Sequence, residues 1–238
     1  MTLLDRPIWE ALSGLQSDFS VGTARARAYR AEIGPLAALG DDTPEALADL
    51  GQLVMDRGAL ILGNDQSVAV PVGCRADWTA ELLQMVATDI EALPSTYEIL
   101  ALSDEDAPEM LALAHLTSPG PFAAQTHRLG QFNGIRIDGR LVAMAGQRMH
   151  LPGYREISGV CTHPDARGLG LAKLLCAAGA AQSLANGERP FLHVLADNEP
   201  AIRVYRSLGF AVRRSFTVSI LVPEANTAMS PNGFTPPR

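Results

Sequence analysis

From residue 96 onward, apolar runs alternate with polar breaks, and the length of each run separates strands from helices. Asp138-Gly139 lies between two apolar runs and suits a tight hairpin turn. Ser103 is a candidate helix cap, because acidic residues follow it directly. The predicted strands are residues 99–102, 132–137, 141–149, 155–162, 191–195, 211–214 and 216–222, and the predicted helices are residues 104–116, residues 168–184 and a segment around Tyr205.

The first 95 residues have a weaker pattern and carry no catalytic motif. Residues 44–62 contain a helical segment, residues 68–72 suit a strand, and residues 78–93 predict a second helix. We expect residues 1–95 to be an N-terminal α/β extension, either a separate cap or a degenerate copy of half of the domain that follows. Residues 223–238 are rich in Pro, Asn, Thr and Gly and predict a loose tail.

Composition limits the classes of function. The 238 residues are 47% hydrophobic and 19% charged, which is enough material for a core. A net charge of -7 argues against a nucleic-acid partner, because binding phosphate backbones requires a basic face. No apolar run reaches the about 18 residues of a membrane span, and the N-terminus has no signal-peptide pattern. We therefore expect a soluble, cytoplasmic protein with no membrane partner.

The three cysteines, Cys74, Cys161 and Cys176, are an odd number without disulfide-like spacing. This usage is typical of a reducing compartment, where such residues pack as small hydrophobic groups. Cys161 and His163 supply at most two metal ligands, so we expect no metal site.

Residues 160–172 read as a buried strand, a glycine-bearing turn and an alanine-rich helix in direct succession. Gly168 and Gly170 have no side chain, so a ligand can approach the backbone closely. The first amides of the helix have no intrahelical carbonyl partner, and the helix dipole adds positive potential. Together with the charge of Arg167, this turn predicts a phosphate-binding site.

Two common phosphate-binding loops do not fit this turn. A Walker loop ends in Gly-Lys-Ser/Thr, whereas this turn continues as Leu171-Ala172-Lys173. A dinucleotide-binding turn needs a small residue three positions after its second glycine, where this chain has Lys173. Three predicted antiparallel strands also precede the turn, which argues further against a nicotinamide-binding protein.

A second motif follows the strand predicted at residues 191–195. Asn198 can cap the start of a helix, and Gly209 permits the left-handed residue that ends it. At helical spacing, Ala201 and Tyr205 lie on the same face, so the phenol is beside a small residue.

The two motifs together resemble those of the GNAT superfamily of N-acyltransferases. The turn has the pattern Arg-Gly-x-Gly-x-Ala from Arg167 to Ala172, and the second segment matches Asn-x-x-Ala-x-x-x-Tyr-x-x-x-Gly-Phe from Asn198 to Phe210. The resemblance covers about residues 96–222. It implies an α/β (α+β) fold, with a mixed, mostly antiparallel central sheet flanked by helices.

The resemblance also implies an activity and its site. Such enzymes transfer an acetyl group from acetyl-CoA to a primary amine by direct attack in a ternary complex. The resemblance places at acetyl-CoA the residues Val160, Cys161, Thr162, Arg167, Gly168, Leu169, Gly170, Leu171, Ala172, Asn198 and Ala201. Tyr205 is expected to protonate the departing thiolate, and Glu156 to accept the amine proton directly or through water.

Both catalytic roles have a plainer alternative. Tyr205 can be a core tyrosine whose hydroxyl bonds to the backbone. Glu156 can be a solvated carboxylate at a strand edge, although strand alternation places it on one face with Ser158 and Val160. His163 and His193 are further titratable candidates, which we expect to be structural.

The acceptor is expected to be the amine of a small molecule or peptide, recognised by the loop at residues 117–130 and the turn at residues 151–154. The side chains there with recognition potential are Phe122, His127, Arg128 and Tyr154. The acidic net charge has two interpretations: it draws in a cationic amine by electrostatic steering, or it serves solubility alone. The acyl length and the oligomeric state stay open, with a homodimer as one option.

A different class of function also fits the motifs: a non-catalytic acyl-CoA sensor that uses residues 1–95 as its output surface. A sensor needs neither Tyr205 nor Glu156, so their presence favours an enzyme.

Overall fold

The structure of the protein is a computed structural model that describes residues 2–64 and 69–224. The strands form a three-stranded and an eight-stranded sheet. The helices are α1 (Pro7–Ser13), α2 (Pro44–Arg57), α3 (Ala107–Thr117), α4 (Leu171–Ala185) and α5 (Glu199–Ser207), with short 3-10 turns at Leu3–Asp5, Ser17–Phe19, Asp104–Asp106, Thr126–Leu129 and Pro164–Ala166. The small sheet contains β1 (Ser20–Gly22), β2 (Ala26–Tyr29) and β3 (Ala37–Leu39). The large sheet contains, in spatial order, β4 (Leu60–Asn64), β11 (Ala211–Pro223), β5 (Cys74–Val86), β10 (Arg189–Leu195), β9 (Tyr154–Thr162), β8 (Arg140–Leu151), β7 (Phe132–Ile137) and β6 (Leu100–Leu102).

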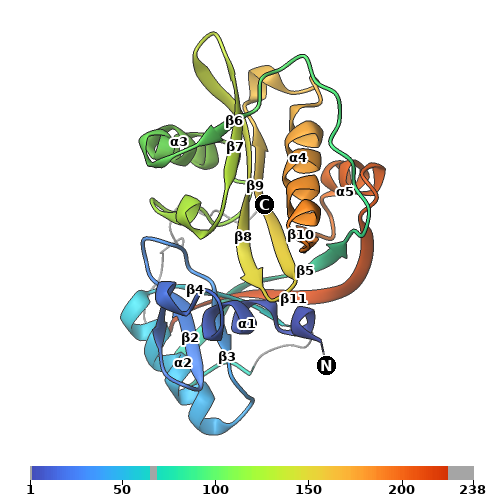
Figure 1. Ribbon diagram of the computed structural model, residues 1–238. Coiled ribbons are helices and arrows are strands. Elements are labelled where there is room, and N and C mark those ends of the chain that lie inside the picture. The colour runs from blue at the N-terminus through green and yellow to red at the C-terminus, as the bar shows by residue number, and fades with distance from the viewer. Residues whose placement is uncertain (1, 65–68, 225–238) are drawn as a thin grey trace.

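Helices cover both faces of the large sheet (Figure 1). α4 contacts β8, β9 and β10 from one face, and α5 adds to the core on that face. α3 packs against β8 and β9 from the other face, where Met110 and Leu113 contact Met144 and Phe132. The large sheet is mostly antiparallel, with β9 and β10 as its parallel pair in the described residues. The expected fold class is therefore confirmed.

The N-terminal part shares the large sheet with the rest of the chain. β5 lies between β10 and β11, and β4 pairs with the outer edge of β11. Residue 95 is thus not a break in the sheet, although α1, α2 and the small sheet form a distinct lower part in Figure 1. The idea that residues 1–95 repeat half of the domain stays a prediction.

The helix predicted at residues 78–93 is wrong, because the chain forms β5 there. Glu81, Leu82 and Met85 have high helix propensity, and this misled the prediction. In the structure β5 pairs with both β10 and β11, so its backbone hydrogen bonds go to strands that lie far away in the sequence. Tertiary pairing therefore overrides local propensity in this segment.

Three other boundaries also differ from expectation. β11 is one strand rather than two, because its pairing with β5 continues through Ser215, which lies opposite Leu83; its register is irregular earlier, between Val212 and Arg214. Residues 69–72 are not in a strand, and Val68 lies outside the described residues. Of the predicted tail at residues 223–238, the structure describes Pro223 and Glu224.

The helix after the glycine turn begins at Leu171 rather than at residue 168. Gly168 has a φ of 84° and Gly170 a φ of 75°, which are left-handed conformations outside the helical region. The hairpin at Asp138-Gly139 is confirmed, with φ values of 51° and 80° that fit a tight turn between twisted strands.

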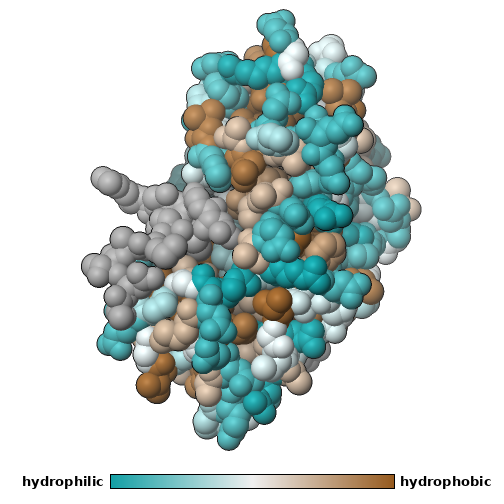
Figure 2. Space-filling view, turned by 90° about the vertical axis from the view of Figure 1, so that its left-hand side faces the viewer, coloured by the Kyte–Doolittle hydropathy of each residue, from teal (hydrophilic) through white to brown (hydrophobic). Residues whose placement is uncertain are grey.

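One face of the surface is seen in Figure 2, where hydrophilic side chains dominate and apolar ones form small separate patches. The apolar sides of the strands are instead covered by helices and by the N-terminal part.

Candidate functional site

The large sheet opens between its two parallel strands. β9 and β10 pair where Tyr154–Glu156 faces Arg189–Phe191. Beyond this point β9 stays paired with β8 and β10 stays paired with β5, so β9 and β10 separate. In the described part of the chain, residues 157–162 of β9 therefore face no strand on the β10 side. A free strand edge of this kind can pair with the amides of an extended ligand.

A bulge in β9 accompanies this opening. The pairing of β9 with β8 shifts between the Met144 and Gly146 pairs, next to Gly159. Gly159 has a φ of 62°, and a Cβ there would lie 2.9 Å from a ring atom of Phe132. Both facts require glycine. Gly159 therefore lies at a β-bulge of β9.

The bulge also reverses the alternation of side chains along β9. Val160 packs toward α4 on the same face as Ile157, whereas Glu156 points to the opposite face. The prediction that Glu156, Ser158 and Val160 share one face is therefore wrong, because the extra residue shifts the period of the strand by one.

The turn after β9 leaves a row of backbone amides unpaired. Among the described residues, no amide from Gly168 to Lys173 donates to a backbone carbonyl, and the first such bond of α4 runs from Leu174 to Gly170 at 3.0 Å. These amides lie at the N-terminus of α4, where the helix dipole adds positive potential. An anion with several oxygens can accept hydrogen bonds from more than one of them.

The outer side of this turn is open space. A Cβ added at Gly168 or Gly170 would meet no atom within 4 Å. Arg167 is exposed directly before Gly168, so its guanidinium can reach a ligand on the turn. The turn thus combines free donors, room and positive charge.

Arg140 brings a second cation close to this turn, and no pattern in the sequence singled it out. Its Nη2 lies 2.8 Å from His163 Nδ1 and 3.2 Å from Asp165 Oδ2. His163 Nδ1 also accepts a hydrogen bond from the Asp165 amide at 3.2 Å. His163 therefore has a structural role at the start of the turn, as expected.

α5 places Tyr205 beside the opening. Asn198 caps the helix, since its Oδ1 accepts from the Ala201 amide at 3.2 Å, and Gly209 ends it with a φ of 94°. The Tyr205 hydroxyl makes no hydrogen bond to the residues that the structure describes. Burial, and then the neighbouring thiols of Cys176 and Cys161, raise the pKa of Tyr205. Its phenol therefore stays protonated at neutral pH.

Glu156 is fully buried in a network of polar side chains. Arg148 donates to both of its oxygens at 2.8 and 2.9 Å, and His193 Nδ1 lies 2.9 Å from Oε1. Burial alone would raise the pKa of Glu156, but the charge of Arg148 and the hydrogen bonds from His193 and Arg148 outweigh it and lower the pKa to about 2.

This environment argues against the predicted role of Glu156 as the base. A carboxylate with a pKa of about 2 binds a proton too weakly at neutral pH to draw one from an amine. The sequence shows that a carboxylate lies on this strand, but its partners Arg148 and His193 come from β8 and β10, and only the fold brings them together.

Glu156 is expected to make stability depend on pH. Its pKa falls from an ordinary 4.5 to about 2 on folding, so its stabilisation is present above about pH 4.5 and is lost as the pH falls through about 2. Over this window we expect the free energy of unfolding to drop by about 3 kcal/mol from this group. Denaturant titrations across the window test this, and an equally steep loss in Glu156→Gln would contradict it.

Comparison with known proteins identifies the fold family. Residues 133–218 match the FR47-like protein family. A crystal structure of a GNAT-family protein from Novosphingobium aromaticivorans is 43% identical to this chain and superposes with a TM-score of 0.88, covering 94% of this chain and 100% of that one. The chain belongs to the GNAT family. A GCN5-related N-acetyltransferase from Kribbella flavida, at 20% identity and a TM-score of 0.66, covers 92% of this chain and 95% of its own and shares the GNAT fold.

Curated relatives match a shorter stretch. Mycothiol acetyltransferase from Actinosynnema mirum is 39% identical over 80 residues, which are 32% of this chain and 27% of that protein. The enzyme of the same name from Saccharomonospora viridis is 37% identical over 90 residues, or 34% of this chain and 29% of that protein. The chain thus spans less than a third of the length of these curated relatives.

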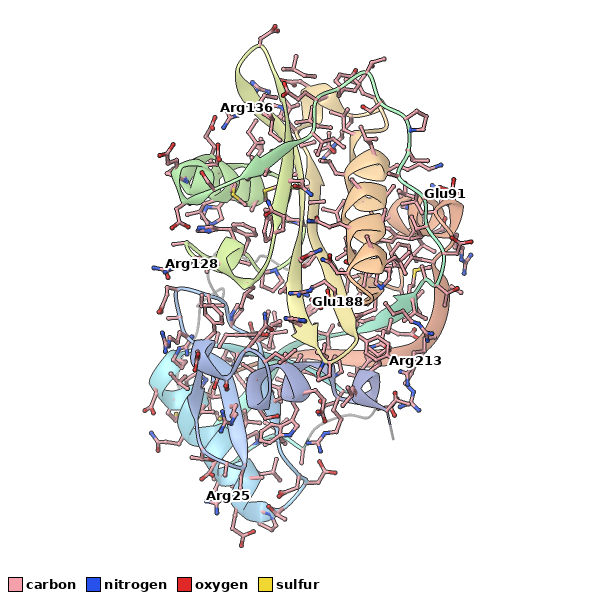
Figure 3. The ribbon with its side chains drawn as sticks, viewed as in Figure 1. Arg25, Glu91, Arg128, Arg136, Glu188 and Arg213 are labelled. Carbon is pink, nitrogen blue, oxygen red and sulfur yellow. The ribbon has the colours of Figure 1, made fainter. Side chains whose placement is uncertain are left out.

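The four side chains predicted to recognise the acceptor differ from one another in burial and in contacts. Phe122 is buried against Phe132, with ring centroids 5.6 Å apart, so it is a core residue and is not exposed to an acceptor. His127 Nε2 lies 2.8 Å from Asp104 Oδ1, while Arg128 is exposed and points away from the sheet (Figure 3). Tyr154 is half-buried at the end of β9 away from the glycine turn.

No helix within the described residues is long and apolar enough to cross a membrane.

Proposed function

We propose that the protein transfers the acetyl group of acetyl-CoA to a primary amine of a small molecule or peptide, by direct attack in a ternary complex. The observation that carries this proposal is the row of free amides from Gly168 to Lys173, which follows the unpaired edge of β9 after the short turn at Pro164–Ala166. The two features together suit a ligand with an extended amide chain and a diphosphate. Membership of the GNAT family supports the same chemistry.

The donor would lie along β9 and across the glycine turn. The backbone of Val160, Cys161 and Thr162 would pair with the pantetheine amides, because this edge has no strand partner on the β10 side in the described structure. The residues proposed to hold the diphosphate are Arg167, Gly168, Leu169, Gly170, Leu171 and Ala172. Asn198 and Ala201 are proposed contacts at the start of α5, where Asn198 Oδ1 is already used by the cap.

The proposed chemistry needs two proton transfers. The amine nitrogen forms a bond to the thioester carbon, a β9 amide stabilises the charge on the carbonyl oxygen, and the carbon–sulfur bond breaks. Tyr205 donates its phenolic proton to the departing sulfur, and its raised pKa keeps that proton in place until then. A base takes the proton that the amine loses.

Coenzyme A release from acetyl-CoA, followed with a thiol reagent across a panel of small-molecule, amino-acid and peptide amines, tests this function. We expect turnover with at least one amine and an acetylated amine as product. Binding of acetyl-CoA without turnover on any amine would contradict the enzyme and support the sensor. A cytoplasmic location stays a prediction, supported by the unpaired state of Cys74, Cys161 and Cys176.

A further inference from the structure

A partly open cavity of about 40 Å³ lies between the large sheet and the N-terminal part. Its walls come from α1, from the loop before β3 and from the strands β4, β5, β8, β10 and β11. Protein cores contain few voids larger than one water molecule. Since this cavity has room for about three water-sized groups, it is large enough to receive part of a ligand.

The walls of the cavity are mainly apolar. They include Ile8, Ile61 and Phe216, while Arg148 and His193 are the polar side chains that the described residues contribute. Both polar side chains already contact Glu156: Arg148 donates to it at 2.8 and 2.9 Å, and His193 Nδ1 lies 2.9 Å from Oε1. Because Glu156 neutralises Arg148, the cavity suits an uncharged aliphatic group.

Gly63 keeps this space open. It lies within β4, opposite Val218 of β11, and a glycine inside a strand often marks the close approach of a ligand. Its φ is outside the left-handed region, so the backbone does not require glycine. An added Cβ would lie 3.6 Å from Ile8 Cδ1, which is an ordinary van der Waals contact. Gly63 and Ile8 both line the cavity, so a larger side chain at position 63 would fill it.

The cavity adjoins the base of the opening in the sheet. Glu156 is the last β9 residue that pairs with β10, and Arg148 and His193 contact it from the two neighbouring strands. In the parallel register His193 lies level with Ser158, one residue before the bulge at Gly159. The thioester of the proposed donor would lie on this edge of β9, so an acyl chain directed toward the N-terminal part leads to the cavity.

We propose that this cavity receives the end of the donor's acyl chain, so that the protein transfers aliphatic acyl groups of up to about four carbons as well as acetyl. The inference rests on the proposed acyl transfer and extends it to the donor. The amine nitrogen bonds to the thioester carbon, the carbon–sulfur bond breaks, the sulfur gains a proton and the amine loses one. Only the length of the transferred chain differs from acetyl transfer.

Calorimetric titration of the wild-type protein with acetyl-, butyryl- and octanoyl-CoA tests burial of the chain without turnover. Each buried methylene group strengthens binding about fourfold, so butyryl-CoA should bind about tenfold more tightly than acetyl-CoA. Octanoyl-CoA should bind more weakly than butyryl-CoA, because its chain exceeds the cavity. Equal affinities for acetyl- and butyryl-CoA would overturn the proposal, and so would a further gain with octanoyl-CoA.

Gly63→Val fills the cavity with a side chain that suits a strand. The quantity to measure is the ratio of kcat/KM for butyryl-CoA to kcat/KM for acetyl-CoA, with the best amine of the panel. In wild type the two constants should lie within about tenfold of each other, and in Gly63→Val the ratio should fall about 30-fold or more. Taking the ratio within one variant removes general losses of activity. An unchanged ratio would overturn the proposal.

Ser219→Val is the matched control. Ser219 follows Val218 on β11 and lies opposite Leu62 of β4, but its side chain is on the other face, where its Oγ lies 3.2 Å from Thr79 Oγ1. The control thus adds a β-branched side chain to the same pair of strands outside the cavity. It should keep the wild-type ratio. An equal fall in this control would overturn the proposal, because disturbance of the two strands would then explain both results.

Phe216→Leu tests the proposal by the opposite change, even if Gly63→Val fails to fold. Phe216 lines the cavity, so a smaller side chain enlarges it. The ratio of kcat/KM for hexanoyl-CoA to that for butyryl-CoA should rise about tenfold over wild type. No rise in this ratio would count against the cavity as the site of the chain.

Succinyl-CoA tests the chemical class of the chain, because its acyl group has four carbons and a terminal carboxylate. We expect it to react more slowly than butyryl-CoA. Faster turnover of succinyl-CoA would assign the cavity to a carboxylate bound by Arg148 and overturn the aliphatic assignment. If wild type releases no coenzyme A from any donor with any amine, the proposed function itself fails, whereas turnover of acetyl-CoA alone refutes only the acyl cavity.

Discussion

Tyr205→Phe is expected to lower kcat by about 100-fold or more and to leave the affinity for acetyl-CoA unchanged. The substitution removes one hydroxyl, which makes no hydrogen bond to the described residues, and keeps the ring that packs against Phe210 at a centroid distance of 6.2 Å. Without the phenolic proton, the thiolate of coenzyme A must leave unprotonated. Steady-state coenzyme A release and calorimetric binding of acetyl-CoA measure the two quantities separately.

Tyr97→Phe is the control for this result, because Tyr97 packs at the edge of the core that α4 forms with β7 and β8 and has no proposed catalytic role. Its kcat should equal that of wild type within error. A Tyr205→Phe enzyme with wild-type kcat would refute Tyr205 as the proton donor and favour its plainer role as a core tyrosine.

Gly170→Val is expected to weaken acetyl-CoA binding by about 100-fold, which corresponds to the loss of about two hydrogen bonds to a charged group. Gly170 has a φ of 75° at the N-terminus of α4, where valine is strained, and its side chain would extend into the open space beside the free amides. The strain alone should lower the free energy of unfolding by about 1–2 kcal/mol. Calorimetry and denaturant titration measure the two effects.

Gly187→Val separates strain from binding. Gly187 follows the other end of α4, has a φ of 76° and likewise has no atom within 4 Å of an added Cβ. We expect it to lose similar stability while binding acetyl-CoA as wild type does. Equal affinity in both variants, whether reduced or unchanged, would show that the turn at Gly170 has no particular role in binding.

Features with local causes could be predicted from the sequence. The cap by Asn198 and the left-handed Gly209 define α5 within its own segment, and both are found in the structure. The hairpin at Asp138-Gly139 is local in the same way. These elements place Tyr205 and the glycine turn relative to their strands, so the approximate positions of both could be predicted from the sequence.

Features that depend on distant partners could not be predicted. The local sequence of β5 predicts a helix. The strands that hold this segment in the sheet, β10 and β11, lie more than a hundred residues later, so no local pattern shows the pairing. The environment of Glu156 depends on Arg148 from one neighbouring strand and His193 from the other. The separation in sequence between Glu156 and each of these residues does not by itself predict a contact. A glycine bulge at Gly159 also changes which side chains share a face, which simple alternation misses.

The account depends most on the claim that the amides from Gly168 to Lys173 hold the diphosphate of acetyl-CoA. Calorimetric titration of the wild-type chain, residues 1–238, with acetyl-CoA tests it most directly. We predict a saturable heat with one site per chain, together with a rise in thermal stability that Gly187→Val retains and Gly170→Val loses. No heat and no protection against thermal unfolding in the wild-type protein would contradict it.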